Sequence, residues 1–172
     1  MRQDYEDKVM KHYTRVAQES GLSASCTMED EYIREGESRA ILRLIELAAK
    51  SAAASLRVLD VGCGNGYTLR TLAERIRDGG LSGSIELLGI EKNHELRQLA
   101  SKMNEGLPVT IAEGDILRAE TLGVSQASVD VCLSQRVIIN LMDPADQKTA
   151  LANLMALVRP GGYLLFIECF QD

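Results

Sequence analysis

The chain has 172 residues, of which 45% are apolar and 26% charged, and its formal net charge at pH 7 is −6. This length and balance predict a single globular domain over residues 1–172. The acidic charge, without any lysine or arginine cluster, disfavours nucleic acid as a partner. No apolar run approaches the ~20 residues that cross a bilayer, so no membrane is expected. The widely separated cysteines predict free thiols in a cytoplasmic protein and no metal site: Cys26, Cys63, Cys132 and Cys169.

The first 54 residues predict an N-terminal helical cap. Residues 4–19 carry Tyr5, Val9, His12/Tyr13 and Val16 at helical spacing, followed by a glycine that can end the helix. A second helix is expected over about residues 30–54. Its buried face is predicted to consist of Ile33, Ala40, Ile41, Leu44, Ile45 and Ala48.

From residue 55 the pattern changes to nearly all-apolar strands that alternate with amphipathic helices. Strands are expected at 56–61, 84–91, 108–115, 127–134 and 163–170, helices at 67–77, 94–104 and 143–158, and a turn at RPGG, residues 159–162. Such alternation predicts a mostly parallel sheet covered on both faces. Right-handed crossovers then give a doubly wound, Rossmann-like α/β core over residues 55–172.

The stretch VLDVGCGNG, residues 58–66, lies at the carboxyl end of the first predicted strand. Ligands of doubly wound sheets bind at that edge, and alternating glycines let the backbone turn sharply and approach a ligand. The dinucleotide fingerprint is G-x-G-x-x-G, whereas this turn is G-x-G-x-G and follows Asp60. A nicotinamide dinucleotide is therefore disfavoured, and a turn that merely connects strand and helix is the alternative without a ligand.

At these residues the chain resembles the class I S-adenosylmethionine-dependent methyltransferases. VLDVGCGNG is similar to their first motif, and the likeness continues in order along the core. The further matching segments are LLGIEKNHE (87–95), EGDI (113–116), VDVCLSQRVI (129–138) and LVRPGGYLLFIE (157–168). Five matches at the right spacing imply an enzyme that binds S-adenosyl-L-methionine and releases S-adenosyl-L-homocysteine.

The resemblance implies a role for each residue of these segments. Asp60 would lie near the amino group of the methionine part, Glu91 would accept hydrogen bonds from the ribose hydroxyls, and Asp115 with the backbone of Ile116 would contact the adenine. The other residues expected at the cofactor line the same pocket, flank the adenine or lie near the reactive methyl: Gly62, Cys63, Gly64, Asn65, Gly66, Lys92, Asn93, Ser134 and Gln135. A small filler is favoured over a catalytic thiol at Cys63.

Candidates for acceptor binding lie after the fourth predicted strand and in the cap. Arg136 either holds a carboxylate or phosphate of the acceptor or pairs with an acidic residue of the cap, and Asn140 is a ligand or a turn former. If the cap covers the pocket, His12 or Tyr13 could reach the acceptor. Arg34 is possible near the methionine carboxylate, although a surface ion pair is favoured there.

The predicted function is methyl transfer to an O or N atom of an unidentified, small acceptor. The alternative is a non-catalytic S-adenosylmethionine-binding module or a fragment of a larger assembly. The resemblance includes a C-terminal hairpin that this sequence lacks, which would leave the fifth strand as an apolar edge. Either a second copy or another partner chain is expected to cover that edge, or the chain is a fragment of something longer; a minimal natural variant of the fold is the third, less favoured explanation. The catalytic residues and the acceptor are left open.

Overall fold

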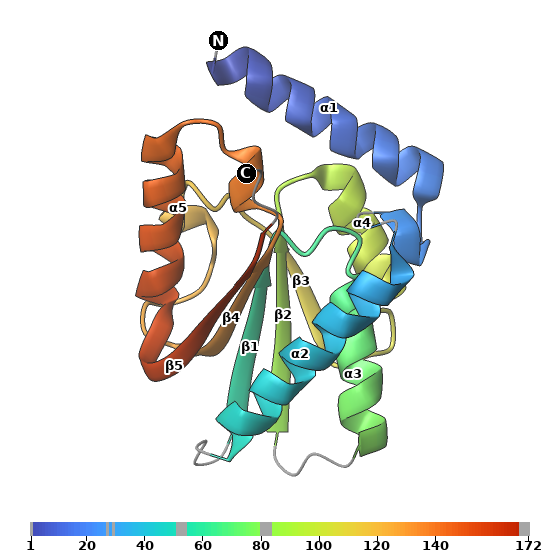
Figure 1. Ribbon diagram of the computed structural model, residues 1–172, viewed down its shortest axis with the longest axis vertical. Coiled ribbons are helices and arrows are strands. Elements are labelled where there is room, and N and C mark those ends of the chain that lie inside the picture. The colour runs from blue at the N-terminus through green and yellow to red at the C-terminus, as the bar shows by residue number, and fades with distance from the viewer. Residues whose placement is uncertain (1, 27, 29, 51–54, 80–83, 169–172) are drawn as a thin grey trace.

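The computed structural model describes residues 2–26, 28, 30–50, 55–79 and 84–168 (Figure 1). The cap consists of α1 (Arg2–Ser20), a 3-10 turn η1 (Ala24–Cys26) and α2 (Glu31–Ala49). The core elements in chain order are β1 (Ser55–Val61), α3 (Tyr67–Gly79), β2 (Ser84–Glu91), α4 (His94–Met103), β3 (Val109–Glu113), η2 (Ala119–Thr121), β4 (Val129–Gln135), η3 (Ile138–Asn140), α5 (Pro144–Leu157) and β5 (Val158–Ile167).

The five strands form one parallel sheet in the order β3-β2-β1-β4-β5. The order reverses direction between β1 and β4, so the glycine turn after β1 lies at the topological switch point. This confirms the predicted doubly wound fold. In the described part of the chain β5 pairs only with β4 and forms one edge of the sheet, and the proposed covering of that edge by a partner remains a prediction.

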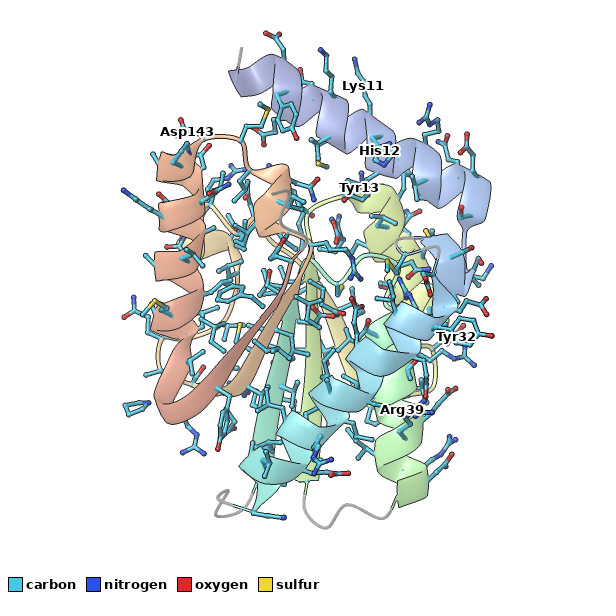
Figure 2. The ribbon with its side chains drawn as sticks, viewed as in Figure 1. Lys11, His12, Tyr13, Tyr32, Arg39 and Asp143 are labelled. Carbon is cyan, nitrogen blue, oxygen red and sulfur yellow. The ribbon has the colours of Figure 1, made fainter. Side chains whose placement is uncertain are left out.

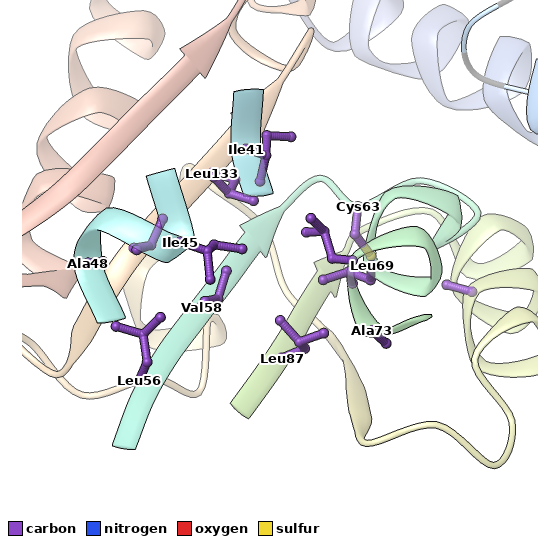
Figure 3. Packing of buried hydrophobic residues seen from close by; sticks show 13 residues of the cluster. Ile41, Ile45, Ala48, Leu56, Val58, Cys63, Leu69, Ala73, Leu87 and Leu133 are labelled. Atoms are coloured by element: carbon purple, nitrogen blue, oxygen red, sulfur yellow. The ribbon is translucent and has the colours of Figure 1, made fainter. Parts of the chain in front are cut away.

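Helices cover both faces of the sheet. On one face α2, α3 and α4 pack over β1 and β2 through a cluster that includes Ile41, Ile45 and Leu69 (Figure 3). On the other face α5 packs through Ala150, Leu154 and Leu157. The central strands β1 and β4 are buried almost throughout, which is why their sequences are largely apolar, whereas the edge strands β3 and β5 are only partly buried.

The predicted buried face of α2 is partly wrong. Ile41, Ile45 and Ala48 are buried, but Ile33 is 50% exposed and Ala40 is also exposed. Arg34 and Ser38 are buried in their place, because they lie on the same face of the helix as Ile41. Apolar spacing alone did not reveal that a buried arginine occupies this stripe. Tyr32 and Arg39 extend from the outer side of α2 (Figure 2).

The segment RPGG was predicted to be a turn, yet these residues lie within β5. Val158 already pairs with Val129, and a register shift follows between Val129 and Val131. Gly161 has a positive φ of 80°, and the guanidinium of Arg159 donates to the Asp130 carboxylate. The chain therefore bends inside an irregular strand rather than between two elements. The last three residues of the predicted strand, 168–170, follow β5 or lie outside the described residues.

The ends of the predicted helix over residues 30–54 also differ. Asp30 caps α2 by accepting from the N–H groups of Tyr32 and Ile33, and the helix ends at Ala49. Residues 51–54 lie outside the described residues. In the described ranges no helix is both long enough and apolar enough to cross a membrane.

Candidate functional site

A cavity of about 700 Å³ opens at the carboxyl ends of β1, β2 and β4. Its floor is the glycine turn after β1, its walls are the segments that follow β2, β3 and β4, and α1 contributes Tyr5, Val9, Met10 and Tyr13 to its cover (Figure 2). The position is the one at which doubly wound sheets bind ligands.

The glycine turn requires glycine at two positions. Gly62 has φ 80°, and a Cβ there would lie 2.3 Å from Cγ2 of Val137. Gly66 has φ 79°, and its Cβ would lie 2.9 Å from the Cα of Ala100 in α4. The glycines thus allow the turn to approach the β4 loop on one side and α4 on the other.

Glu91 stabilises this turn from the end of β2. Its side-chain oxygens accept hydrogen bonds from the backbone N–H of Gly64 at 2.9 Å and of Asn93 at 2.8 Å. The residue is only 8% exposed, and burial raises its pKa although the two backbone donors oppose the rise. Glu91 lines the cavity, where a carboxylate with two oxygens can still accept hydrogen bonds from a ligand.

Asp60 lies beneath the turn and is fully buried. Its Oδ2 is 3.5 Å from Nε2 of Gln135, and its Oδ1 has no hydrogen-bond partner among the described residues. Burial, followed by the nearby negative charge of Glu91, raises the pKa of Asp60 to about 7. A buried carboxylate with an unpartnered oxygen is costly when ionised, and a bound cation would stabilise the ionised form of Asp60.

The loop after β3 supplies a third acidic residue, Asp115. Asp115 accepts from the backbone N–H of Leu117 at 3.0 Å and pairs with Lys92 at 2.9 Å. Burial alone would raise the pKa of Asp115, but these partners outweigh it and lower the pKa. Lys92 also pairs with Glu6 of α1, so this wall of the cavity is tied to the cap.

Two asparagines fix α1 and the turn behind it to the core. The carbonyl oxygen of Asn93 caps α4 by accepting from Leu96 N–H, while its amide nitrogen donates to the Met10 carbonyl and to Thr14. Asn65 likewise accepts from Tyr67 N–H and donates to the carbonyls of Gly21 and Ser23. Both residues were expected at the cofactor, which stays a prediction, and in the structure the amide nitrogen of each holds the cap.

The opposite wall carries two arginines. Arg34 is 5% exposed, and its guanidinium lies 4.7 Å from the centre of the Tyr67 ring. Arg136, at the end of β4, donates from Nη1 to Glu37 of α2 at 2.6 Å. The pairing of Arg136 with an acidic cap residue, one of the two predicted alternatives, is therefore present. The surface ion pair favoured for Arg34 is not compatible with its burial.

The structure brings most of the predicted site residues together. Those that line the cavity are Gly62, Cys63, Gly64, Asn65, Glu91, Lys92, Asp115, Ile116, Gln135, Arg136, Asn140 and Tyr13. Those that lie behind the lining are Asp60, Gly66, Asn93 and Ser134. His12 is exposed and outside the lining, with its ring 5.2 Å from that of Tyr13. Burial raises the pKa of Cys63 well above its ordinary value, which suits a packing role.

Sequence reasoning missed Tyr67 and Thr68, which follow the glycine turn and line the cavity. Their place at the first turn of α3 was the available signal, because the start of this helix must face the ligand edge. Thr68 accepts from Gln135 Nε2 at 3.2 Å, so the first turn of α3 also positions the end of β4.

Comparison with known proteins shows which family the chain belongs to. A family model described as a methyltransferase domain matches residues 58–162. A ubiquinone biosynthesis O-methyltransferase from Paraburkholderia phymatum is 33% identical over 112 residues, 64% of this chain and 43% of the relative. A carboxy-S-adenosyl-L-methionine synthase from Aliivibrio fischeri is 28% identical over 143 residues, 80% of this chain and 55% of the relative.

Among solved structures, the N-methyltransferase NodS from Bradyrhizobium japonicum in complex with S-adenosyl-L-homocysteine has the same fold. The TM-score is 0.61 at 23% identity, covering 90% of this chain and 71% of NodS. The chain belongs to the class I S-adenosylmethionine-dependent methyltransferases, a family that uses S-adenosylmethionine. It spans between 33% and 55% of the length of the curated relatives it matches.

Proposed function

We propose that this chain binds S-adenosylmethionine in the 700 Å³ cavity and transfers its methyl group to an oxygen or nitrogen atom of a small acceptor. The carrying observation is the buried Asp60 carboxylate, whose Oδ1 has no hydrogen-bond partner in the described part of the chain. Such a group fits the ammonium of the methionine part, and the adjacent glycine turn and Glu91 fit the ribose.

The charged groups of the cavity divide the cofactor into two ends. Arg34, which lines the cavity beside Tyr67, would hold the carboxylate of the methionine part, and Asp60, beneath the glycine turn, would bind its ammonium through the unpartnered Oδ1. Glu91 would accept from the ribose hydroxyls, and Asp115 from the adenine amino group. Lys92 would then keep Asp115 ionised beside the adenine rather than contact the cofactor directly.

The bound cofactor supplies a methyl group that is activated by a sulfonium. The acceptor lone pair would take this methyl group, and the sulfonium would leave as a neutral thioether that keeps the electrons of the carbon–sulfur bond. The acceptor's N–H or O–H proton is released to solvent. The chain's own contribution is alignment and exclusion of water. The cover formed by α1, with Tyr13 facing the acceptor side, performs that exclusion.

Two measurements test this function. Calorimetric titration with S-adenosylhomocysteine and, separately, with NADH identifies the ligand of the glycine turn. Tight NADH binding without a response to S-adenosylhomocysteine would overturn the proposal. Incubation with methyl-labelled S-adenosylmethionine and a panel of small alcohols, phenols and amines then tests transfer, with release of S-adenosylhomocysteine as the signal.

Two other outcomes have a distinct readout. A non-catalytic binding module would bind S-adenosylhomocysteine and release none from S-adenosylmethionine with any acceptor. The match to carboxy-S-adenosyl-L-methionine synthases offers a second candidate reaction, in which the cofactor itself gains a carboxyl group. Mass spectrometry of the cofactor after incubation distinguishes that product from the unmodified cofactor.

A further inference from the structure

One corner of the cavity is not used by the proposed cofactor contacts. It is formed by Arg136 at the end of β4, Asn140 in η3 and Tyr13 in α1, and all three residues line the cavity. The chain separation between Tyr13 and Asn140 is 127 residues, so only the docked cap creates this corner.

Asn140 fixes the geometry of the corner. Its amide nitrogen donates to the Tyr13 hydroxyl oxygen at 3.0 Å and to the backbone carbonyl of Arg136 at 2.7 Å. Because the Tyr13 oxygen already accepts a hydrogen bond, its own O–H must point elsewhere as a donor. Burial raises the pKa of Tyr13, although the bond from Asn140 opposes the rise, so the phenol keeps this proton.

Arg136 is held in an unusual backbone conformation. Its φ is +55°, which is uncommon for a residue with a side chain, and its N–H donates to the Ile167 carbonyl at 2.7 Å. Strain of this kind persists where the surroundings impose it, and functional sites are frequent examples. The backbone thus places the guanidinium at the cavity wall.

Glu37 binds only one of the nitrogen atoms of the Arg136 guanidinium. It accepts from Nη1, while a guanidinium has five N–H donors in total. The Arg136 and Glu37 side chains are 19% and 13% exposed, so this charge pair is largely out of water. Arg34 lies close enough that the charge of Arg136 contributes to lowering its pKa, after the larger effect of burial. Since Arg34 is assigned to the methionine carboxylate, Arg136 is the cation of this wall that is left to bind a second anion.

We propose that the methyl acceptor carries a carboxylate, which binds in this corner to the guanidinium of Arg136 and the hydroxyl of Tyr13. The inference rests on the proposed function. The cavity lining also includes the apolar residues Val9, Leu141 and Met142 and the acidic residues Asp143 and Asp146, so the acceptor is expected to have an apolar part and no second carboxylate. Arg136 and Tyr13 bind and orient the acceptor, and neither takes part in the bond exchange.

The test uses matched pairs of ligands with the cofactor site filled. The protein is saturated with S-adenosylhomocysteine and titrated by calorimetry with benzoate and benzamide, phenylacetate and phenylacetamide, and salicylate and salicylamide. At least one acid is expected to bind ten times more tightly than its amide. Equal binding of every pair, or no acid-selective binding at all, overturns the inference. If the unmodified protein does not bind S-adenosylhomocysteine at all, the proposed function is contradicted instead.

Variants assign the selectivity to the corner. Arg136→Gln should abolish it and Tyr13→Phe should reduce it about threefold, with S-adenosylhomocysteine binding retained. Glu37→Gln releases the guanidinium from its partner and should increase acid affinity severalfold, so the test survives if Arg136→Gln fails to fold. Arg39→Gln and Tyr32→Phe are matched controls, because both residues are exposed and lie outside the cavity lining. Unchanged selectivity in Arg136→Gln and Tyr13→Phe, together with unchanged acid affinity in Glu37→Gln, contradicts the assignment.

Discussion

The two ends of the cavity are built in different ways. The glycine-turn end depends on backbone groups and on carboxylates at the ends of adjacent strands, and Glu91 accepts directly from the backbone of Gly64 and Asn93. The corner at Arg136 depends on side chains from distant segments, with Glu37 of α2 and Tyr13 of α1 as partners. The first arrangement is set by the core sheet, whereas the second exists only when the cap is in place. We expect the first to determine the cofactor and the second the acceptor.

The largest effect is expected from Asp60→Asn. Loss of the buried charge should weaken S-adenosylhomocysteine binding about 100-fold, in line with ~3 kcal/mol for a charged hydrogen bond. The cofactor-free protein should become more stable at pH 8, because a pKa raised from 3.8 to about 7 corresponds to about 4 kcal/mol. Calorimetry and chemical denaturation measure the two effects.

A buried aspartate at the other end of the sheet provides the control for that substitution. Asp130 accepts from Arg57 N–H and pairs with Arg159, and it does not line the cavity. Asp130→Asn should destabilise the protein and leave S-adenosylhomocysteine affinity unchanged. Equal losses of affinity in both variants would show that the effect is structural and not local to the cofactor.

Arg34→Gln should weaken S-adenosylhomocysteine binding about 30-fold, because a buried cation and its contact with the methionine carboxylate are lost. Arg34→Lys should recover only part of the affinity, since an ammonium cannot reproduce a planar group that stacks on Tyr67. Equal affinity of wild type and Arg34→Gln would mean that the methionine carboxylate binds elsewhere.

The affinity for S-adenosylhomocysteine is expected to depend on pH through Asp60, at the glycine-turn end of the cavity. Asp60 must ionise to bind a cation, so S-adenosylhomocysteine affinity should rise about tenfold between pH 6 and pH 8. The charged or titratable neighbours of Asp60 are Glu91, Arg136, Arg34, Cys63 and Cys132. Stability of the cofactor-free protein should change in the opposite direction. Its contribution from Asp60 is complete below pH 3.8 and is lost as the pH rises to about 7.

Calorimetry across this pH range, in buffers of different ionisation enthalpy, measures affinity and proton release together. The Asp60→Asn variant should lose both the slope and the released proton. A slope that survives in that variant would assign the titration to another group, with Glu91 as the first candidate because burial also raises its pKa.

The smallest effect is expected at the contact between cap and core. Asn93→Ser keeps an oxygen that can cap α4 but removes the amide that donates to Met10 and Thr14. S-adenosylhomocysteine should dissociate about threefold faster, with little change in the association rate, as measured by stopped-flow fluorescence with a competing analogue. Thr149→Ala is the control, because Thr149 donates to the Ala145 carbonyl within α5 and lies outside the cavity lining. Equal dissociation rates in wild type and Asn93→Ser would show that this contact does not retain the ligand.

The two ends of the cavity also differ in how far the sequence predicted them. The first four strands and the glycine turn were predicted from local spacing, because a buried parallel strand and the turn after it are encoded by consecutive residues, whereas the role of Glu91 was implied by the family resemblance. The burial of Arg34 and the pairing of Arg136 with a specific partner, Glu37, depend on how α2 packs across the sheet. Spacing within one helix contains no information about that contact, so Ile33 and Ala40 were assigned to the core in error.

The two asparagines that hold α1 imply a timing for the ligand. Each caps or braces a core helix with its oxygen and holds the cap with its nitrogen, so movement of α1 would break the bonds to the cap and leave those within the core. If S-adenosylmethionine binds beneath this cover, its exchange is expected to involve movement of α1. Residence time would be set by the opening of one helix, and turnover could be limited by release of the spent donor rather than by methyl transfer.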